Sequence, residues 1–194
     1  RLIREILSDW NDECDSIYLF ANSSVLNFYP KFGFVPEKEY QYTLPVSAKE
    51  SDFVKLDMDQ EKDREVLKRC YQKSNPFSAL PMNGNYGLLM FYCSSYMKDC
   101  VYYSPQLDTV CVATQSGGVL ACLDIFGNPP CTMEDVISLA AGSETKFSLL
   151  GFPPKHAEKC TCAEKESEET LFVLQGKDNI FVQNKVMFPA LSHA

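Results

Sequence analysis

The sequence predicts an α/β (α+β) protein in which helices flank a mixed, mostly antiparallel central sheet. Three observations support this class. Strand patterns at 101–103, 109–114 and 119–125 are joined by short turn sequences, which indicates an antiparallel meander. Thr132-Met133-Glu134-Asp135 has the capping-box pattern that begins a helix. The apolar run 17–21 is followed by polar residues suited to helix N-caps, so that a buried strand leads directly into a helix.

Length and composition limit the classes of protein that need to be considered. The chain has 194 residues, 45% of them hydrophobic, which is enough for one large domain or two small ones with real cores. Its net charge of −8 argues against non-specific nucleic-acid binding and suits a cationic small substrate, although acidic surfaces mostly serve solubility. No stretch has the length of a membrane span and no signal-peptide pattern is present, so we expect a cytoplasmic protein with no membrane partner.

The nine cysteines show no regular disulfide spacing, and several lie in apolar segments, as free thiols do. Cys160 and Cys162, four and six residues after His156, form half of a zinc-binding pattern. No second pair of ligands at ordinary spacing accompanies them. We therefore expect surface thiols rather than a metal site.

The most informative stretch is Ser16–Phe34. After the strand, the pattern predicts a short helix that contains Val25, Leu26 and Tyr29, is kinked at Pro30 and ends at Gly33. Asn22, the Phe-Tyr pair ending at Tyr29, and the Lys-Phe-Gly-Phe that follows resemble the late strand-to-helix segment of the GNAT (Gcn5-related) N-acetyltransferase family. The resemblance extends from Asp15 to Tyr42.

This resemblance implies an acetyl-CoA-dependent transferase that acetylates an amine of a small molecule or peptide. It places Asn22 against the pantetheine arm of acetyl-CoA and gives Tyr29 the task of protonating the departing thiolate. A tyrosine hydroxyl suits that task because it stays protonated at neutral pH until a thiolate forms beside it. Asn27 is a further candidate for contact with the cofactor, and a solvated asparagine is the alternative. The catalytic base and the acceptor-binding residues remain unassigned.

The resemblance also predicts the domain organisation. Residues 1–13 form an amphipathic helix. In the family, the pyrophosphate-binding loop precedes this helix, so we expect an N-terminally truncated fragment in which 1–46 are the end of one GNAT domain. After a polar linker at 47–52, the order of predicted helices and strands in 53–194 matches a second GNAT-like domain. Residues 171–174 are expected to form a strand, and short apolar runs at 180–182 and 185–188 are expected to complete its sheet.

The second domain lacks the features that bind acetyl-CoA in this family. Pro129 and Pro130 offer no N–H where the pyrophosphate loop would lie. The strand that ends at Leu150 is followed by no asparagine and no tyrosine-bearing helix. We therefore expect this domain to be structural or to shape the acceptor pocket. The alternative for the whole chain is a non-catalytic module that keeps the fold for interaction, and the sequence is also compatible with a homo-oligomer.

Overall fold

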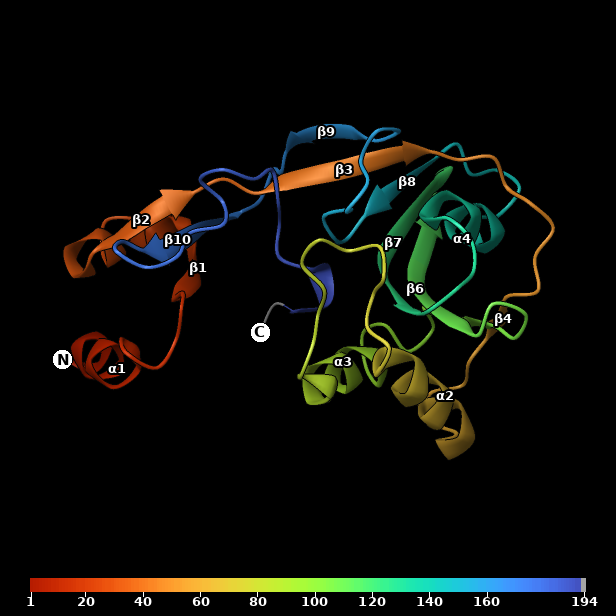
Figure 1. Cartoon of the computed structure of the whole chain (residues 1–194), viewed down its shortest axis with the longest axis horizontal. Helices are drawn as coiled ribbons and strands as arrows, with labels where there is room; N and C mark the ends of the chain where they lie inside the picture. The colour runs from red at the N-terminus through yellow and green to blue at the C-terminus, as the bar shows by residue number, and fades with distance from the viewer. Residues whose placement is uncertain (193–194) are drawn as a thin grey trace. The chain divides into compact units, whose positions relative to one another are not determined.

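The structure is a computed structural model that describes residues 1–192. The chain forms two compact units (Figure 1). Unit 1 consists of residues 1–40 and 164–186, and unit 2 consists of residues 41–163 and 187–192. The sequence analysis assigned 164–186 to the second domain and 41–46 to the first. The structure groups both segments differently. The strand in 164–186 pairs with strands of residues 1–40, and the strand that contains 41–45 pairs with strands of unit 2.

Unit 1 contains one helix, two 3₁₀ turns and a three-stranded antiparallel sheet in the order β1-β10-β2. Its elements are α1 (Leu2–Trp10), β1 (Tyr18–Asn22), η1 (Ser23–Val25), η2 (Tyr29–Phe32), β2 (Phe34–Glu37) and β10 (Glu169–Leu174). The core of this unit is formed by buried residues of the strands, with side chains of α1 packed against it.

Unit 2 is built on a seven-stranded sheet in the order β4-β5-β6-β7-β8-β3-β9. Its strands are β3 (Tyr40–Pro45), β4 (Val54–Lys55), β5 (Val101–Ser104), β6 (Thr109–Ser116), β7 (Val119–Gly127), β8 (Phe147–Leu150) and β9 (Thr161–Glu164). Its helical elements are α2 (Glu61–Tyr71), α3 (Tyr86–Cys93), α4 (Met133–Ala140) and η3 (Ala190–Ser192). β7 and β8 are parallel, whereas β5, β6 and β7 pair antiparallel in the expected meander, and β4 pairs antiparallel with β5. The predicted mixed, mostly antiparallel sheet is therefore confirmed.

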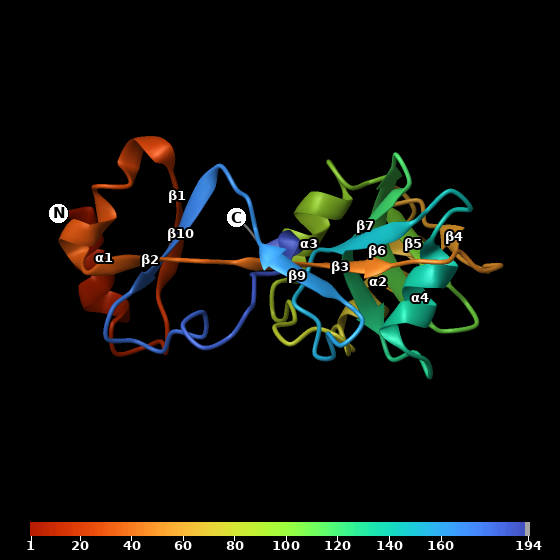
Figure 2. The ribbon, with the colours of Figure 1, turned by 90° about the horizontal axis from the view of Figure 1, so that it is seen from above.

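The two sheets exchange strands. β3 follows β2 after two residues, yet it joins the sheet of unit 2 between β8 and β9, as Figure 2 shows. β10 follows β9 in the chain, yet it lies between β1 and β2 in unit 1. Each three-strand set, β1-β10-β2 and β8-β3-β9, thus has a central strand from the other half of the sequence. The runs 180–182 and 185–188, which were predicted to complete a sheet, form no strand.

Helices cover both faces of the sheet in unit 2. The buried side chains of α4 pack with Cys111 and Ala113 of β6, whereas those of α2 and α3 pack with Val110 and Val112. Since successive residues of a strand point to opposite faces, the two clusters lie on opposite sides of the sheet. The capping box predicted for α4 is present, with the Thr132 hydroxyl accepting from the Asp135 N–H at 3.2 Å.

Candidate functional site

The candidate site begins where β1 ends. Asn22 is the last residue of β1, is exposed, and serves as the N-cap of η1. Its Oδ1 accepts from the backbone N–H of Ser24 at 3.0 Å and from the Ser24 hydroxyl at 2.5 Å. These two bonds use the amide oxygen. Within residues 1–192 the Nδ2 donor of Asn22 forms no hydrogen bond.

The segment after Asn22 is not the helix that the sequence predicted. It forms two separate 3₁₀ turns, η1 and η2, with Pro30 in the first turn of η2. Proline lacks the N–H that a continuous helix would need at this position and disfavours helical geometry in the residue before it. Gly33 ends η2 in the left-handed conformation at φ 89°, as expected for a helix-ending glycine.

Tyr29 begins η2 and is half-buried among aromatic rings. Its ring centroid lies 5.2 Å from that of Phe28, 6.1 Å from Phe34 of β2 and 5.9 Å from Phe172 of β10. Three elements therefore fix the ring plane. No hydrogen bond to the Tyr29 hydroxyl is formed by any of residues 1–192, so that oxygen can still bind an external partner.

Asn27 lies between the two turns and is exposed. The described structure shows no hydrogen bond between Asn22, Asn27 and Tyr29, although all three lie within one short surface segment. Sequence reasoning missed the contribution of Phe172. It lies more than a hundred residues beyond Tyr29, and no local pattern links the two.

The N-termini of α1 and α4 differ in a way that bears on anion binding. No side chain caps α1, whose N-cap residue is Arg1. Its first turn contains Arg4 and Glu5, and Glu5 forms an ion pair with Arg1 at 2.9 Å. At α4, the capping box occupies backbone donors, and Glu134 and Asp135 place negative charge in the first turn. Free N–H groups and the positive end of the helix dipole favour anions, so α1 is the better suited of the two.

In unit 2 the comparable position is Gly151, directly after β8. Its backbone groups are already hydrogen-bonded within the protein. The Gly151 N–H donates to the Cys122 carbonyl at 2.7 Å, and the Gly151 carbonyl accepts from Ala190 at 2.7 Å. A Cβ at Gly151 would lie 2.5 Å from the Leu123 carbonyl oxygen, and the neighbouring Phe152 is fully buried. Main-chain hydrogen bonds and close packing therefore occupy this position.

The described residues also bear on metals and membranes. No group of three or more metal-ligating side chains occurs within residues 1–192. All nine cysteines are free, and burial raises the pKa of Cys160 to about 11, which keeps that thiol protonated. None of the helices that the described part of the chain forms has the length and apolar character needed to span a bilayer.

Comparison with solved structures identifies the architecture. A structure from Enterococcus faecalis described as a probable N-acyltransferase aligns with 89% of this chain at 12% identity and a TM-score of 0.51. The chain has the GNAT-type N-acyltransferase fold. Eis1 from Mycobacterium abscessus aligns with 88% of the chain at 15% identity and a TM-score of 0.46. A GCN5-related N-acetyltransferase from Kribbella flavida aligns with 89% of the chain at 12% identity and a TM-score of 0.46.

The alignments cover only part of the solved GNAT structures. This chain spans about half of each, namely 48%, 50% and 46% in the order given above. No protein-family model and no curated protein matches the sequence. The predicted GNAT fold is therefore established by structure, while the roles of Asn22, Asn27 and Tyr29 remain predictions.

Proposed function

We propose that this chain is part of an acetyl-CoA-dependent N-acetyltransferase that transfers an acetyl group to an amine. The observation that supports this most directly is the surface segment at the end of β1, in which Asn22 and Asn27 are exposed and Tyr29 is half-buried, in a chain with the GNAT-type fold. A fold alone hosts many functions, so the proposal depends on what these side chains can do.

Asn22 is proposed to bind the pantetheine arm. Its Oδ1 is already used by Ser24, which leaves Nδ2 as the group that faces a ligand. An amide donor of this kind matches the carbonyl oxygens of pantetheine. Asn27 is proposed as a weaker cofactor contact from the same surface segment, because its exposed amide can donate and accept.

Tyr29 is proposed as the general acid. A neutral amine attacks the thioester carbonyl, the carbon–sulfur bond breaks, and the electron pair leaves with sulfur. The Tyr29 hydroxyl then donates its proton to that thiolate, while the proton lost by the amine passes to a base outside the assigned residues. The aromatic contacts with Phe34 and Phe172 hold the ring in one orientation, which such a transfer requires.

Unit 2 is proposed to be non-catalytic. The closed position at Gly151, the two prolines after β7 and the acidic, capped N-terminus of α4 each work against binding of a phosphate-bearing cofactor. Its proposed role is to support unit 1 or to shape the acceptor pocket. The acceptor is proposed to be a small-molecule or peptide amine rather than nucleic acid, in keeping with the net charge of −8.

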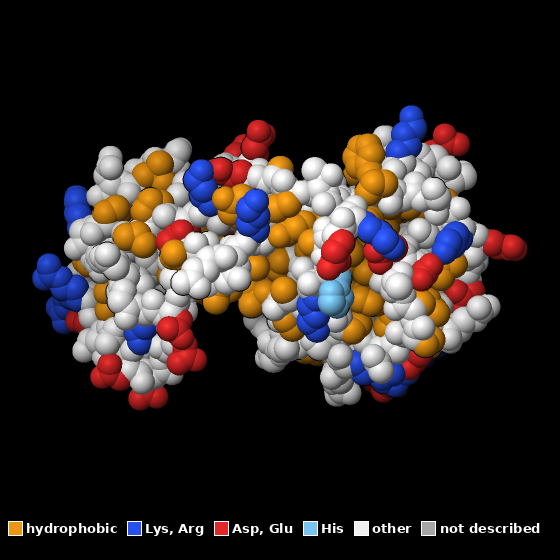
Figure 3. Space-filling model, turned by 45° about the horizontal axis from the view of Figure 1, so that its top comes forward, with side chains coloured by type: hydrophobic (Ala, Val, Ile, Leu, Met, Phe, Trp, Pro, Cys, Tyr) orange, Lys and Arg blue, Asp and Glu red, His pale blue; other side chains and the backbone are white. Residues whose placement is uncertain are grey.

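On the face shown in Figure 3, Lys and Arg side chains are interspersed with Asp and Glu side chains. This distribution supports the proposal that the partner is not a nucleic acid, because binding of a nucleic acid needs a clustered basic surface. The nine free cysteines support a proposed location in the reducing cytoplasm. Self-association into a homo-oligomer also remains a proposal.

Calorimetric titration with acetyl-CoA and an amine-acetylation assay would test the function. The comparison should include the 194-residue chain, the same chain with the residues that its gene encodes upstream, and Tyr29→Phe in each. We expect Tyr29→Phe to bind acetyl-CoA normally and to lower kcat by roughly 100-fold, because one acid is removed. Tyr96→Phe, at a tyrosine of unit 2 that is 77% exposed, is the matched control. Absence of binding heat in both wild-type forms would contradict the proposal and favour a non-catalytic module.

A further inference from the structure

Unit 2 contains a cavity beside the first turn of α4. Its volume is about 300 Å³, and its lining comes from residue 77, from 132–134 and from the loop 156–159 that follows β8. Backbone hydrogen bonds hold this loop in place. The Lys155 N–H donates to the Phe77 carbonyl at 2.7 Å, and the Ala79 N–H donates to the Pro153 carbonyl at 2.8 Å. The cavity is therefore built by the fold of unit 2 from segments that are far apart in sequence.

Part of the cavity wall is apolar. Met133 is buried in the core cluster that α4 shares with the sheet, and the half-buried ring of Phe77 packs against the same cluster. An apolar wall with a few polar groups is the usual form of a small-molecule site. Such a wall favours a ligand with an apolar body, such as an aromatic ring or a short alkyl chain.

The charged groups of the cavity differ in exposure. The Glu134 side chain is 31% exposed, whereas Lys159, whose Nζ lies 3.2 Å from the Glu134 Oε1, is 71% exposed. The backbone N–H of Glu134 and the Lys159 ammonium group lower the pKa of the Glu134 carboxyl, although burial acts in the opposite direction. This carboxyl is therefore ionised at neutral pH. Glu158 adds a second, more exposed carboxylate to the lining.

The start of α4 offers little to an anion. The capping box occupies the N–H groups of Thr132 and Asp135, at 3.3 Å and 3.2 Å from their acceptors. The Glu134 N–H is bound by its own carboxylate. The two acidic side chains in the first turn also oppose the attraction of the helix dipole for negative charge. The less exposed charge in the cavity is thus negative, which favours a cation.

We propose that this cavity binds a small organic cation with an apolar body and an ammonium group. The body lies against Phe77 and Met133, and the ammonium group binds the Glu134 carboxylate in place of Lys159. The Phe77 ring strengthens the preference for a cation, because aromatic rings attract positive charge. Lys159 is readily displaced, since an exposed ion pair contributes little free energy. The site takes no part in acetyl transfer and does not rest on the proposed function.

Titration of the 194-residue chain with 2-phenylethylamine at pH 7, followed by amide NMR spectra, tests the proposal. This probe combines a phenyl ring with an ammonium group. We expect saturable shifts of the amide signals of Phe77, Glu134 and Lys159. Phenylacetate carries the same ring with a negative charge, and ethylamine carries the positive charge without the ring. Each of these two should bind at least about tenfold more weakly than the probe.

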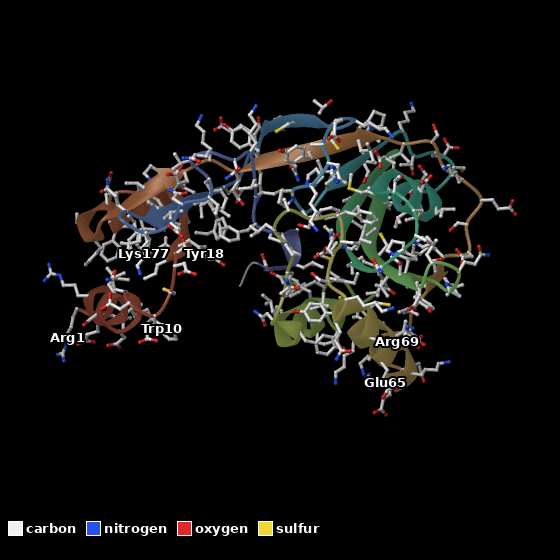
Figure 4. The ribbon with its side chains drawn as sticks, in the orientation of Figure 1. Arg1, Trp10, Tyr18, Glu65, Arg69 and Lys177 are labelled. Atoms are coloured by element: carbon white, nitrogen blue, oxygen red, sulfur yellow. The ribbon has the colours of Figure 1, made fainter. Side chains whose placement is uncertain are left out.

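Variants of two glutamates provide a matched pair. Glu134→Gln should weaken binding of 2-phenylethylamine by about tenfold, because a neutral amide replaces the charged partner of the ammonium group. Glu65→Gln removes the same charge from α2, on the opposite face of the sheet, and should leave the affinity unchanged. Figure 4 shows the Glu65 side chain extending from α2 into solvent.

Lys159→Met gives the sharpest test, because the sign of its effect depends on the charge of the ligand. For a cation, binding should become roughly threefold tighter, since the variant removes the ammonium group that competes for Glu134. Weaker binding of the probe by Lys159→Met, or tighter binding of phenylacetate than of the probe, would overturn the proposal. Equal affinity of Glu134→Gln and wild type for the probe would place the probe elsewhere on the protein and overturn the proposal as well.

The outcome is separable from that of the proposed function. Binding of 2-phenylethylamine that depends on Glu134, in a protein that does not bind acetyl-CoA, would support the cation site and contradict the transferase. Binding of acetyl-CoA by a protein in which the probe leaves the signals of Phe77, Glu134 and Lys159 unchanged would support the transferase and contradict the cation site.

Discussion

Asn75 and Asp124 form a buried hydrogen bond in unit 2, in which the Asn75 Nδ2 donates to the Asp124 Oδ1 at 2.6 Å. Asp124 lies on β7, is fully enclosed, and also accepts from the Ile125 N–H at 2.9 Å. Its Oδ2 has no hydrogen-bond partner among residues 1–192. Burial raises the pKa of Asp124 to about 7, although the bonds from Asn75 and Ile125 act in the opposite direction.

This burial predicts that stability falls as the pH rises. In the unfolded chain the Asp124 carboxyl loses its proton near pH 4, whereas in the folded protein it keeps the proton up to about 7. Between these values the folded state binds more protons, so the free energy of unfolding decreases and reaches its lower value above pH 7. Asp124→Asn should flatten this slope and stabilise the protein at pH 8 by about 2–4 kcal/mol.

Urea unfolding of wild type and Asp124→Asn at pH 5 and pH 8 would check this expectation. Asp99→Asn is the control, because the pKa of this exposed carboxyl is lowered by Lys55 and it titrates below the range tested. A variant Asp124→Asn that is less stable than wild type at pH 8 would show that the ionised carboxylate is favourable in the fold.

A second prediction concerns the ion pair between Lys165 and Glu39 in unit 1, whose charged atoms lie 2.8 Å apart. The two side chains are only 17% and 6% exposed. Lys165→Met should therefore cost about 3 kcal/mol of unfolding free energy, because it removes a charged partner that lies 2.8 Å from a buried carboxylate. The double variant with Glu39→Gln should recover much of that loss.

Lys38→Met is the matched control for this pair. Lys38 contacts Glu164 at 2.7 Å in the same unit, but both side chains are more than half exposed. The control should leave unfolding by urea nearly unchanged, since water screens an exposed pair. If the two lysine variants lost the same free energy of unfolding, burial would not explain the contribution of the Lys165–Glu39 pair.

Local sequence signals predicted local structure well. The capping box at Thr132, the left-handed Gly33 and the meander of β5, β6 and β7 all appear as expected. Each of these features depends on residues that are close in sequence. In the capping box a side chain binds a nearby backbone N–H, and at Gly33 the glycine allows a positive φ. The prediction of a helix after Asn22 was wrong. The apolar spacing suggested a helix, but Pro30 lacks the N–H that a continuous helix needs.

The strand exchange could not be predicted in the same way. β2 and β3 are separated only by Lys38 and Glu39, a spacing that would normally suggest a hairpin. The absence of glycine, asparagine or aspartate at these two positions argues against a tight two-residue turn, and this signal could have been used. Which strands β3 and β10 join is decided by packing between residues that are far apart in sequence, as in the contact of Tyr29 with Phe172. The three candidate site residues were located by resemblance, and their chemistry remains to be tested.

A third prediction concerns the acid range. The Asp108 carboxylate lies 2.6 Å from the Arg69 guanidinium and 2.5 Å from the Lys73 ammonium group. These hydrogen bonds, from Lys73 first and then Arg69, lower the pKa of Asp108 to about 2. The stabilisation is present above pH 4 and is lost as the pH falls toward 2, because the folded state then binds fewer protons than the unfolded chain.

Asp108→Asn should therefore cost about 1 kcal/mol at pH 7, a value reduced for solvent screening of a side chain that is 38% exposed. Asparagine also tolerates the positive φ of 47° at this position, so the backbone should not be strained. The difference from wild type should vanish in unfolding measurements near pH 2. A difference that persists there would indicate a loss of packing rather than of charge.

The last prediction concerns Gly151, whose added Cβ would lie 2.5 Å from the Leu123 carbonyl oxygen and 2.7 Å from the Leu123 Cα. Both are backbone atoms, so a methyl group can be accommodated only by moving β7 away from the chain that follows β8. Gly151→Ala should therefore destabilise unit 2 by about 2–3 kcal/mol, as overpacking of a tight core does. Gly87→Ala is the control, because that glycine lies in α3 and its added Cβ would meet nothing within 4 Å apart from the neighbouring residues and backbone of its own helix. Alanine there should stabilise the helix by about 0.5–1 kcal/mol. If Gly151→Ala unfolds like wild type, the backbone of β7 and the chain after β8 can move apart at little cost, and the close contact with Leu123 does not determine the stability of unit 2.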